Sequence, residues 1–475
     1  MQNLCNIKNN ALLIREVYFF MTKSMTEGKI LPEILTFSIP LLLGNIVQQT
    51  YNFIDAMIVG RTLGPDALGA VGATSSVQFL VLGLCIGMCV GFGVPVAQRF
   101  GANDLPDMRR YIYNSYILTG ISMIVITTIT AILCNPILHL LKTPASIFKD
   151  TYGYLLIIFL GIPATLAYNL LSSVLRAVGD STTPFIFLVI SAVLNIFLDL
   201  FCILVLHLGV PGAALATIAS QAVSAVLCFF YMRKKFDILR VRKEERGFDR
   251  KKAGKLLYMA LPMGLQYSIT AIGSMVMQSA NNSLGALYTS AFSAALRIKQ
   301  MAMCPFDAIA SAVSTFVGQN YGARNVDRIK KGIKQGVAVG VTYGIAIGIV
   351  LIFFGRTMSM AFITDTGGRT SQILDASGRF LRASGFFYWS LGILNVVRLA
   401  VQALGYSNLA IISGVVEMVA RSVMALVFVP IGGFTVICFT DQTAWVSATT
   451  YSTLICIYVV KKIEKRLKNP TNAPI

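Results

Sequence analysis

Long apolar runs separated by short polar segments recur from one end of the chain to the other. A helix needs about twenty mostly apolar residues to cross a bilayer. On that basis the chain contains twelve candidate crossings. They lie at 34–58, 71–97, 114–136, 153–175, 185–207, 211–231, 256–280, 294–318, 334–354, 377–403, 409–430 and 436–460. The pattern predicts an all-α polytopic membrane protein.

Composition favours the same fold class and excludes several others. The 475 residues are 55% hydrophobic and 13% charged, and the mean hydropathy is +0.70. In soluble domains, about a quarter of the residues are charged. The hydrophobic excess therefore excludes a soluble globular protein, a disordered chain and a nucleic-acid-binding module. We expect a lipid bilayer as a partner and no nucleic acid.

Basic residues give the direction of the crossings. Segment 233–255 holds eleven Lys or Arg against four acids, and segments 322–334 and 461–468 each hold five against one. With twelve crossings, these segments and the Arg109–Arg110 pair fall on one side, which the positive-inside rule places in the cytoplasm. The loop at 356–382 carries four arginines on the other side and runs against this interpretation. The sequence predicts a multi-pass protein of the cell inner or plasma membrane with both termini cytoplasmic.

The chain repeats itself once. Three short motifs recur in the same order at offsets of 222, 221 and 226 residues. They lie at 35–40, 98–102 and 176–181 in the first half, and at 257–262, 319–323 and 402–407 in the second. Six crossings per repeat is an even number, so the halves are parallel and related by a pseudo-two-fold axis along the membrane normal. Two-lobed repeats of this kind are typical of secondary transporters.

The repeat predicts a division of the chain into five parts. Residues 1–24 lack the features of a signal peptide, and the sequence leaves Met1, Met21 and Met25 all open as the true start. The predicted parts are a cytoplasmic tail at 1–30, an N-lobe of helices 1–6 at 31–232, a basic cytoplasmic linker at 233–255, a C-lobe of helices 7–12 at 256–460 and a basic cytoplasmic tail at 461–475.

The sequence carries no pattern for enzyme or cofactor chemistry. No G-x-x-x-x-G-K-[ST] motif for nucleotide binding occurs. The nine cysteines are scattered, and the two histidines, His139 and His207, lie near span ends. We therefore expect no enzyme activity and no cofactor, and the energy for transport must come from a gradient of H⁺ or Na⁺ or from a partner.

Two carboxylates inside apolar spans are the candidate coupling groups. On the first span, four polar residues fall at i, i+3, i+4 and i+7 and share one face. They are Gln48, Tyr51, Asn52 and Asp55. On the fifth span, Asn195 and Asp199 stand four apart. No basic residue lies in the apolar part of the first six spans, so neither acid has an obvious ion-pair partner. Such an acid can accept a proton, bind Na⁺ or attract a cationic substrate; the alternative is a hydrogen-bonded acid that fixes helix packing.

The C-terminal half carries different chemistry. Glu417 and Arg421 stand four apart on the eleventh span and can neutralise each other, which favours a structural pair. Arg398 can reach Glu417 or extend to the interface, and the role of Asp307 is open. Met277 occupies the position equivalent to Asp55, so the two lobes are not chemically equivalent.

At these residues the sequence resembles the multidrug and toxic compound extrusion (MATE) family of secondary transporters. The resemblance covers about residues 25–465 and rests on three motifs together with twelve spans in two parallel lobes. The motifs are Val96–Ala102, Leu175–Pro184 and Phe316–Ala323. The resemblance implies antiport, in which amphipathic organic cations (drugs, toxins, dyes) leave the cell in exchange for H⁺ or Na⁺.

The sequence is most similar to the prokaryotic branch with coupling acids in the N-lobe. The positions that match its cation-coupling residues are Asp55, Tyr154, Asn195, Asp199 and Thr217, and all of these except Tyr154 would ligate the metal ion in a Na⁺-coupled carrier. The resemblance places Gln48, Tyr51 and Asn169 along the substrate cavity, and Asn52 joins them as a member of the stripe. Pro40 matches a proline at which the first helix bends on protonation. The seventh span lacks the acid that another branch uses, which disfavours coupling in the C-lobe.

Other functions stay open at this stage. A flippase for lipid-linked oligosaccharides or other lipids is the alternative among transporters, and it would need several cationic residues in the cavity. An integral-membrane transferase would need clustered His or Asp motifs at the interface, and a channel of this size would need a pore built by subunit symmetry. The sequence does not determine the ion, the natural substrate or the oligomeric state, for which a monomer is our expectation.

Overall fold

The computed structural model describes residues 24–141, 143–363 and 369–468, and within these ranges it contains helices and no strands. The helices of the first half are α2 (Ile30–Leu63), α3 (Pro65–Gly101), α4 (Leu105–Leu140), α5 (Ala145–Leu160), α6 (Ile162–Ala177), α7 (Thr182–Leu200), η1 (Phe201–Val205) and α8 (Gly209–Lys235). Two short turns, η2 (Asp237–Leu239) and η3 (Lys243–Glu245), lie in the linker. The helices of the second half are α9 (Arg250–Asn282), α10 (Ala286–Gly322), α11 (Val326–Ser359), η4 (Met360–Phe362), α12 (Thr370–Gly385), α13 (Tyr388–Ala403), α14 (Ser407–Val423), η5 (Met424–Phe428) and α15 (Val429–Lys468).

These helices provide the twelve predicted crossings. Nine helical segments of the described chain are long and apolar enough to cross a bilayer, and two bent pairs of shorter helices bring the number to eleven. One of the nine, Ser407–Leu467, is 61 residues long, which is more than enough for two crossings. Its backbone breaks at Gly433, where φ is 56° and ψ is −141°. The segment therefore crosses twice, which gives twelve.

The fourth and tenth crossings are bent, which the apolar pattern did not predict. The axes of α5 and α6 differ by 43° across Gly161, and those of α12 and α13 differ by 53° across Phe386 and Phe387. A Cβ atom on Gly161 would overlap the Ile218 side chain of α8. Glycine at this bend thus lets α8 pack directly against the junction of α5 and α6.

Interruptions of the helices recur at equivalent places in the two halves. The matched residues with positive φ are Gly64 and Gly285, Asn103 and Arg324, Gly179 and Gly405, and Gly209 and Gly433. A π-helical turn likewise follows both α7 and α14. The bends of the fourth and tenth crossings complete the correspondence. The predicted fold of two six-helix lobes related by an internal repeat is confirmed in these details of the backbone.

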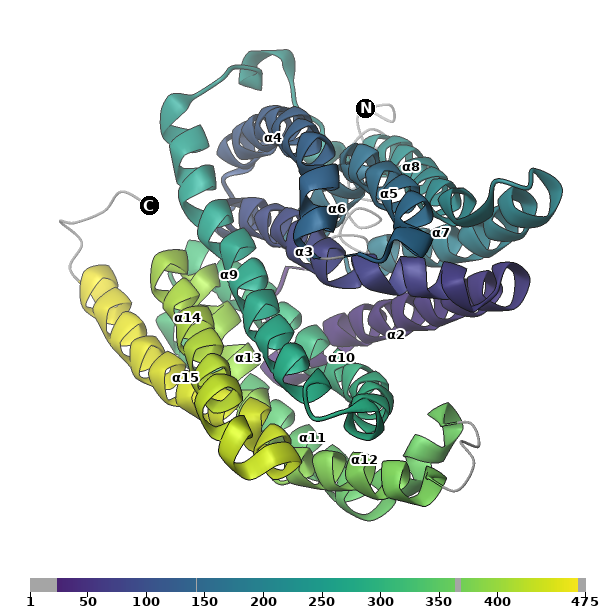
Figure 1. The fold of residues 1–475 in the computed structure, drawn as a ribbon. Coiled ribbons are helices and arrows are strands. Elements are labelled where there is room, and N and C mark those ends of the chain that lie inside the picture. Colours follow the sequence, from purple (N-terminus) through teal and green to yellow (C-terminus); the bar gives the residue numbers. More distant parts are fainter. Residues whose placement is uncertain (1–23, 142, 364–368, 469–475) are drawn as a thin grey trace, which may run out of the picture.

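The first helix of each half packs across the boundary between the halves. Figure 1 shows α3–α8 in one bundle and α9–α15 in the other. The second helix of the N-lobe, α3, packs along α9, and the second helix of the C-lobe, α10, packs along α2. A Cβ atom on Gly91 of α3 would overlap Ala260 of α9, so these helices meet backbone to backbone. The two lobes are therefore joined by a pair of equivalent helix contacts.

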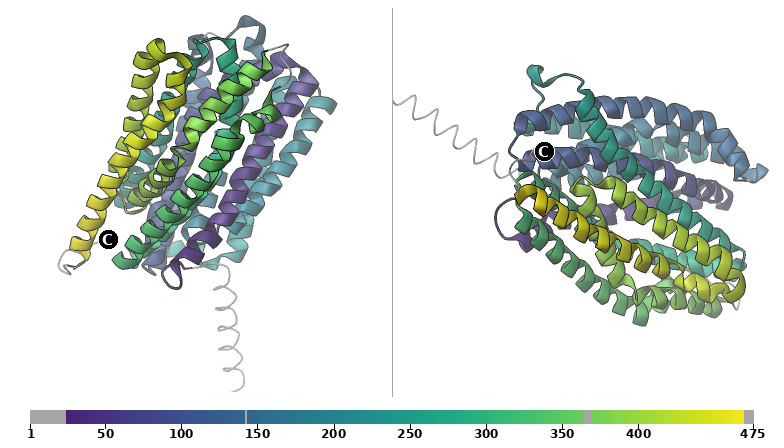
Figure 2. Two further views of the ribbon diagram at one scale, coloured as in Figure 1. Left: turned by 90° about the horizontal axis from the view of Figure 1, so that it is seen from below. Right: turned by 90° about the vertical axis from the view of Figure 1, so that its left-hand side faces the viewer.

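Helix α2 begins and α15 ends at the same end of the molecule, which we call the terminal end (Figure 2). The linker is fixed there, because Arg109 of α4 forms a buried ion pair with Glu245 of η3 at 2.6 Å. Met25 is also fixed there: it is only 2% exposed and packs with Phe37 and Phe316 in one apolar cluster. The predicted tail at 1–30 is thus packed against the molecule at Met25, and α2 begins at Ile30; Met1 and Met21 lie outside the described residues.

The outer faces of both lobes are apolar. Ile124 of α4, Phe353 of α11 and Ile431 of α15 are 71%, 74% and 82% exposed. Soluble proteins rarely expose contiguous apolar surface of this extent. These side chains are placed as they would be against lipid.

Candidate functional site

Part of the polar stripe on α2 faces the interior of the N-lobe. The Tyr51 side chain contacts the side chains of Gln48 on its own helix and Gln221 on α8, and it interacts electrostatically with Asp55. Helical spacing explains the first contact, because residues three and four apart share a face. Packing of α2 against α7 and α8 explains the others. Tyr51 and Asp55, which are half-buried, therefore face helices of their own lobe, whereas Gln48 is exposed.

Asp55 and Asp199 lie opposite each other. Asp199 of α7 is completely buried, and Asn195, one turn earlier, is 1% exposed. The two carboxyl groups are close enough to share a hydrogen bond if one of them carries a proton. No other hydrogen-bond partner among the described residues reaches Oδ1 of Asp55 or either carboxylate oxygen of Asp199. Two acids from different helices thus form one centre.

Neutral polar groups surround the two acids. Asn195 Nδ2 donates to Thr217 Oγ1 of α8 at 3.4 Å, and Asn195 Oδ1 is buried without a partner in the described chain. Tyr154 of α5 interacts electrostatically with both acids, and its hydroxyl contacts Gln78 of α3. Oxygen ligands of the carboxylate, carbonyl and hydroxyl types suit a hard cation. Asp55, Asp199, Asn195 and Thr217 supply that set, and the two carboxylates equally suit a proton.

The described residues provide no counter-ion for this pair. Neither Asp55 nor Asp199 occurs in an ion pair of the described chain, and no Lys or Arg contributes to the electrostatic environment of either carboxyl group. Unpaired charge in a membrane-embedded lobe is costly and is retained at functional sites. The centre can therefore exchange one cation for another without first breaking an ion pair.

Not every predicted residue joins this centre. Asn52 is exposed on α2, and Asn169 of α6 donates to the carbonyl of Thr165 at 2.8 Å, one turn earlier in its own helix. Pro40 lies within α2, which continues across it. Fifteen residues separate Pro40 from Asp55, which is about 22 Å along a helix axis.

Two residues of the centre were absent from the sequence prediction. Gln78 contacts Tyr154, and Gln221 accepts a hydrogen bond from Thr165 at 2.7 Å and contacts Tyr51. Both are glutamines inside apolar spans, which is a usable signal, since an amide that faces lipid has no partner. Their spans are rich in Gly, Ala and Ser, and that composition hid them.

In the C-lobe, by contrast, buried charges form a continuous chain of ion pairs. Lys299 of α10 pairs with Asp441 of α15, and Asp441 also accepts from Arg421 Nε at 2.8 Å. Arg421 pairs with Glu417 at 2.7 Å, and Arg398 pairs with Glu417 at 3.2 Å. The predicted pair of Glu417 and Arg421 exists, and Arg398 reaches Glu417 rather than the interface.

Asp307 lies beside this chain of ion pairs. Asn395 Nδ2 donates to Asp307 Oδ1 at 3.4 Å, and Arg398 donates to Asn395 Oδ1 at 2.8 Å. Met277, the equivalent of Asp55, is 2% exposed in the apolar core of the C-lobe. The C-lobe thus has no equivalent of the N-lobe centre at the repeat-related position.

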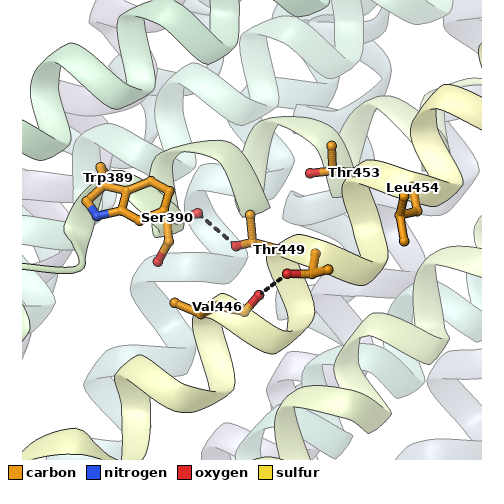
Figure 3. Close-up of a pocket in the computed structure, with 7 residues that line it drawn as sticks. Trp389, Ser390, Val446, Thr449, Thr453 and Leu454 are labelled. Atoms are coloured by element: carbon orange, nitrogen blue, oxygen red, sulfur yellow. Dashed lines mark hydrogen bonds between the residues drawn. The ribbon is translucent and has the colours of Figure 1, made fainter.

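A pocket of about 270 Å³ lies between α13 and α15, away from these charges (Figure 3). Thr449 Oγ1 donates to the Ser390 carbonyl at 3.0 Å, and Thr450 Oγ1 donates to the Val446 carbonyl at 2.9 Å. Trp389 and Leu454 are 40% and 64% exposed at its rim. The lining carries no ionisable side chain; the Thr449 hydroxyl is used in a bond from α15 to α13, and the Thr450 hydroxyl in a bond within α15. The pocket therefore offers no chemistry for coupling.

Known proteins resemble the chain in sequence and in fold. The MatE family model matches twice, at residues 40–201 and 262–427. The "Probable multidrug resistance protein YpnP" of Bacillus subtilis (strain 168) is 36% identical over 386 residues, which cover 80% of this chain and 84% of that protein.

Two solved structures share the fold at 22% identity. "Crystal structure of MATE in complex with MaL6" has a TM-score of 0.87 and covers 94% of this chain and 100% of the other. "Outward-facing conformation of a multidrug resistance MATE family transporter of the MOP superfamily" has a TM-score of 0.86 and covers 94% and 99%. The two matches of the family model coincide with the two lobes, and with the relative from Bacillus subtilis they show that this chain belongs to the MatE family of membrane transporters.

Proposed function

We propose that this protein is a secondary antiporter that exports amphipathic organic cations in exchange for inward-moving H⁺ or Na⁺. The observation that carries the proposal is the facing pair of Asp55 and Asp199, which has no counter-ion among the described residues. One relative is named a multidrug resistance protein, which agrees with an organic substrate. No observation favours a lipid-linked oligosaccharide flippase.

The exchange follows from competition at one centre. A proton or Na⁺ neutralises the carboxylates from the outside, and a cationic substrate is attracted to them from the inside. Coupling requires only that the ion and the substrate favour different conformations of the carrier. The rings of Tyr51 and Tyr154 beside the acids supply aromatic faces, which attract organic cations.

The proposal includes an orientation and a location. The terminal end carries the linker with its eleven basic residues, and Lys330 pairs with Glu464 there at 2.7 Å. At the opposite end, the loop at 356–382 carries four arginines, fewer than the linker alone. The proposal places the terminal end in the cytoplasm and the protein in the cell inner or plasma membrane, with a monomer as the acting unit.

The test is efflux of ethidium, a fluorescent organic cation, from proteoliposomes with a pH gradient or a Na⁺ gradient imposed separately. Asp55→Asn removes one charge without changing the shape of the side chain. We expect gradient-driven efflux by this variant to fall to the level of empty vesicles. The matched control is Asp150→Asn, an exposed acid of α5 in the same lobe that forms no ion pair in the described chain, and it should transport normally. Undiminished efflux by Asp55→Asn under both gradients contradicts the proposal.

A further inference from the structure

Two glutamines at equivalent positions of the repeat join the lobes at the terminal end. Gln98 Nε2 of α3 donates to the carbonyl of Ala403 in the C-lobe at 2.8 Å. Gln319 Nε2 of α10 donates to the carbonyl of Ala177 in the N-lobe at 2.9 Å. The glutamines are 2% and 0% exposed. Ala177 and Ala403 are themselves repeat equivalents, so each lobe gives one donor and one acceptor to a reciprocal pair of bonds.

Glycines bring the two helices together at this point. Gly101 and Gly322 follow the glutamines by three residues, and each lies against the backbone of the opposite glutamine. A Cβ atom on Gly101 would overlap the carbonyl of Gln319, and one on Gly322 would overlap the carbonyl of Gln98. The close approach of α3 and α10 therefore depends on glycine, and it places both amides within reach of the other lobe.

Gln319 also holds the segment that leads into α2. We call residues 25–29 the strap. The Met25 amide donates to Gln319 Oε1 at 2.8 Å, and Asn320 Nδ2 donates to the Met25 carbonyl at 2.9 Å. Arg328 Nη1 donates to the Gly28 carbonyl at 2.8 Å. The side-chain amide of Gln319 in the C-lobe thus bonds both to Ala177 and to the segment that precedes α2, the helix that carries Asp55.

A contact between the lobes nearer the opposite end is of another kind. Phe53 of α2 meets Phe362 of η4 edge to face, with ring centroids 6.5 Å apart, and the Arg297 guanidinium lies 5.8 Å from the Phe53 ring. Phe53 is 41% exposed. Buried directional bonds therefore close the terminal end, and a partly exposed ring contact links the lobes nearer the other end.

We propose that Gln98 and Gln319 are the latch of the gate at the terminal end, and that their bonds to Ala403 and Ala177 must break before the lobes separate there. The proposal rests on the proposed antiport, in which the centre is exposed to each side in turn. Neutral amides suit a latch, since water can satisfy both the amide and the carbonyl once the lobes part.

The latch is asymmetric because of the strap. Loss of Gln98 removes one bond between the lobes, whereas loss of Gln319 removes an equivalent bond and also releases the Met25 amide. Gln319→Glu separates these roles, because a carboxylate still accepts from Met25 but cannot donate to Ala177. The three variants should open the terminal end in the order Gln319→Ala, Gln319→Glu, Gln98→Ala.

The experiment measures the distance between spin labels on the two lobes. Arg110 of α4 and Lys331 of α11 are exposed repeat equivalents near the terminal end and form no ion pair in the described chain. Both are changed to cysteine in a cysteine-free background and labelled. One net hydrogen bond shifts a two-state equilibrium by a factor of about five. We expect each glutamine variant to raise the ratio of long to short distances by about fivefold or more.

Gln335→Ala is the matched control, since this glutamine of α11 forms no side-chain hydrogen bond in the described chain and should leave the distances unchanged. The same distance distribution in the parent and in all three variants overturns the latch. Labelling needs no gradient, so this result is independent of whether transport is found. Failure of the parent to transport ethidium under either gradient, with the distance shifts intact, would instead count against the antiport and leave the latch standing.

Discussion

The two lobes hold their buried charges in opposite ways. In the N-lobe, Asp55 and Asp199 face each other and no cation of the described chain pairs with them. In the C-lobe, Asp441 and Glu417 are each held by two cations. The same backbone frame thus supports a centre whose acids have no counter-ion in the described chain and a network in which both acids are paired. Whether a buried acid is ion-paired, rather than its presence alone, distinguishes acids that can exchange cations from acids that hold helices together.

The largest expected effect comes from breaking the paired network. Asp441→Asn removes the partner of Lys299 and one of the two acids that pair with Arg421, which leaves a buried cation of the C-lobe unpaired. Breaking a buried pair in this way costs about 3–5 kcal/mol of folding free energy. A large fall in the thermal unfolding temperature in detergent is the expected measurement.

The exposed pair of Arg356 and Asp375 provides the control for that experiment. Their side chains are 46% and 58% exposed. Because solvent screens such pairs, Asp375→Asn should cost about 0–1 kcal/mol. Equal unfolding temperatures for Asp441→Asn and Asp375→Asn would show that the network does not stabilise the C-lobe.

Replacement of an acid in the unpaired centre should change the stability of the protein in the opposite direction. Asp199→Asn removes a buried charge that has no counter-ion and lies against another acid. Relief of that cost should raise the unfolding temperature at neutral pH, while ethidium efflux is lost. The comparison fails if this variant loses stability to the same extent as Asp441→Asn.

The last comparison tests an ion pair outside the membrane-spanning segments. Arg109 holds the pKa of Glu245 below its usual value through its hydrogen bonds to the carboxylate. A lowered pKa in the folded state stabilises the protein above the ordinary Glu pKa of about 4.3, and this contribution is lost as the pH falls through the lowered value. Glu245→Gln should therefore cost about 1–2 kcal/mol at neutral pH.

That difference should disappear in strongly acidic solution, where the parent carboxyl is also protonated. Unfolding temperatures of both proteins measured across the acid range check the prediction. A constant difference at every pH would mean that the charge of Glu245 plays no part.

Apolar run length was enough to predict the twelve crossings, because a crossing is defined by length and hydropathy. It could not predict the bends at Gly161 and at Phe386, since an apolar run reads the same whether its helix is straight or bent. The strap at Met25 was predicted as part of a tail, because its partners Gln319, Asn320 and Arg328 lie about three hundred residues away in sequence. Contacts over such separations leave no local pattern.

In the candidate site, too, features within one helix could be predicted and contacts between distant helices could not. Helical spacing predicted the shared face of Tyr51 and Asp55, and spacing within α7 predicted that of Asn195 and Asp199. That the two acids meet depends on how α2 packs against α7, which the spacing within either helix does not determine. The pairing of Lys299 with Asp441 was missed because these residues are 142 positions apart on different helices.

The matched backbone interruptions have a consequence for stoichiometry. The frame is doubled in the details of its turns and breaks, yet within the described helices Asp55 has an apolar methionine as its equivalent in the other half. In the proposed antiport, a duplicated scaffold with the facing pair of unpaired acids in one half alone has at most these two carboxylates to neutralise in each turnover. The internal duplication thus doubles the helical framework of the carrier without doubling the number of acids that can bind the driving ion.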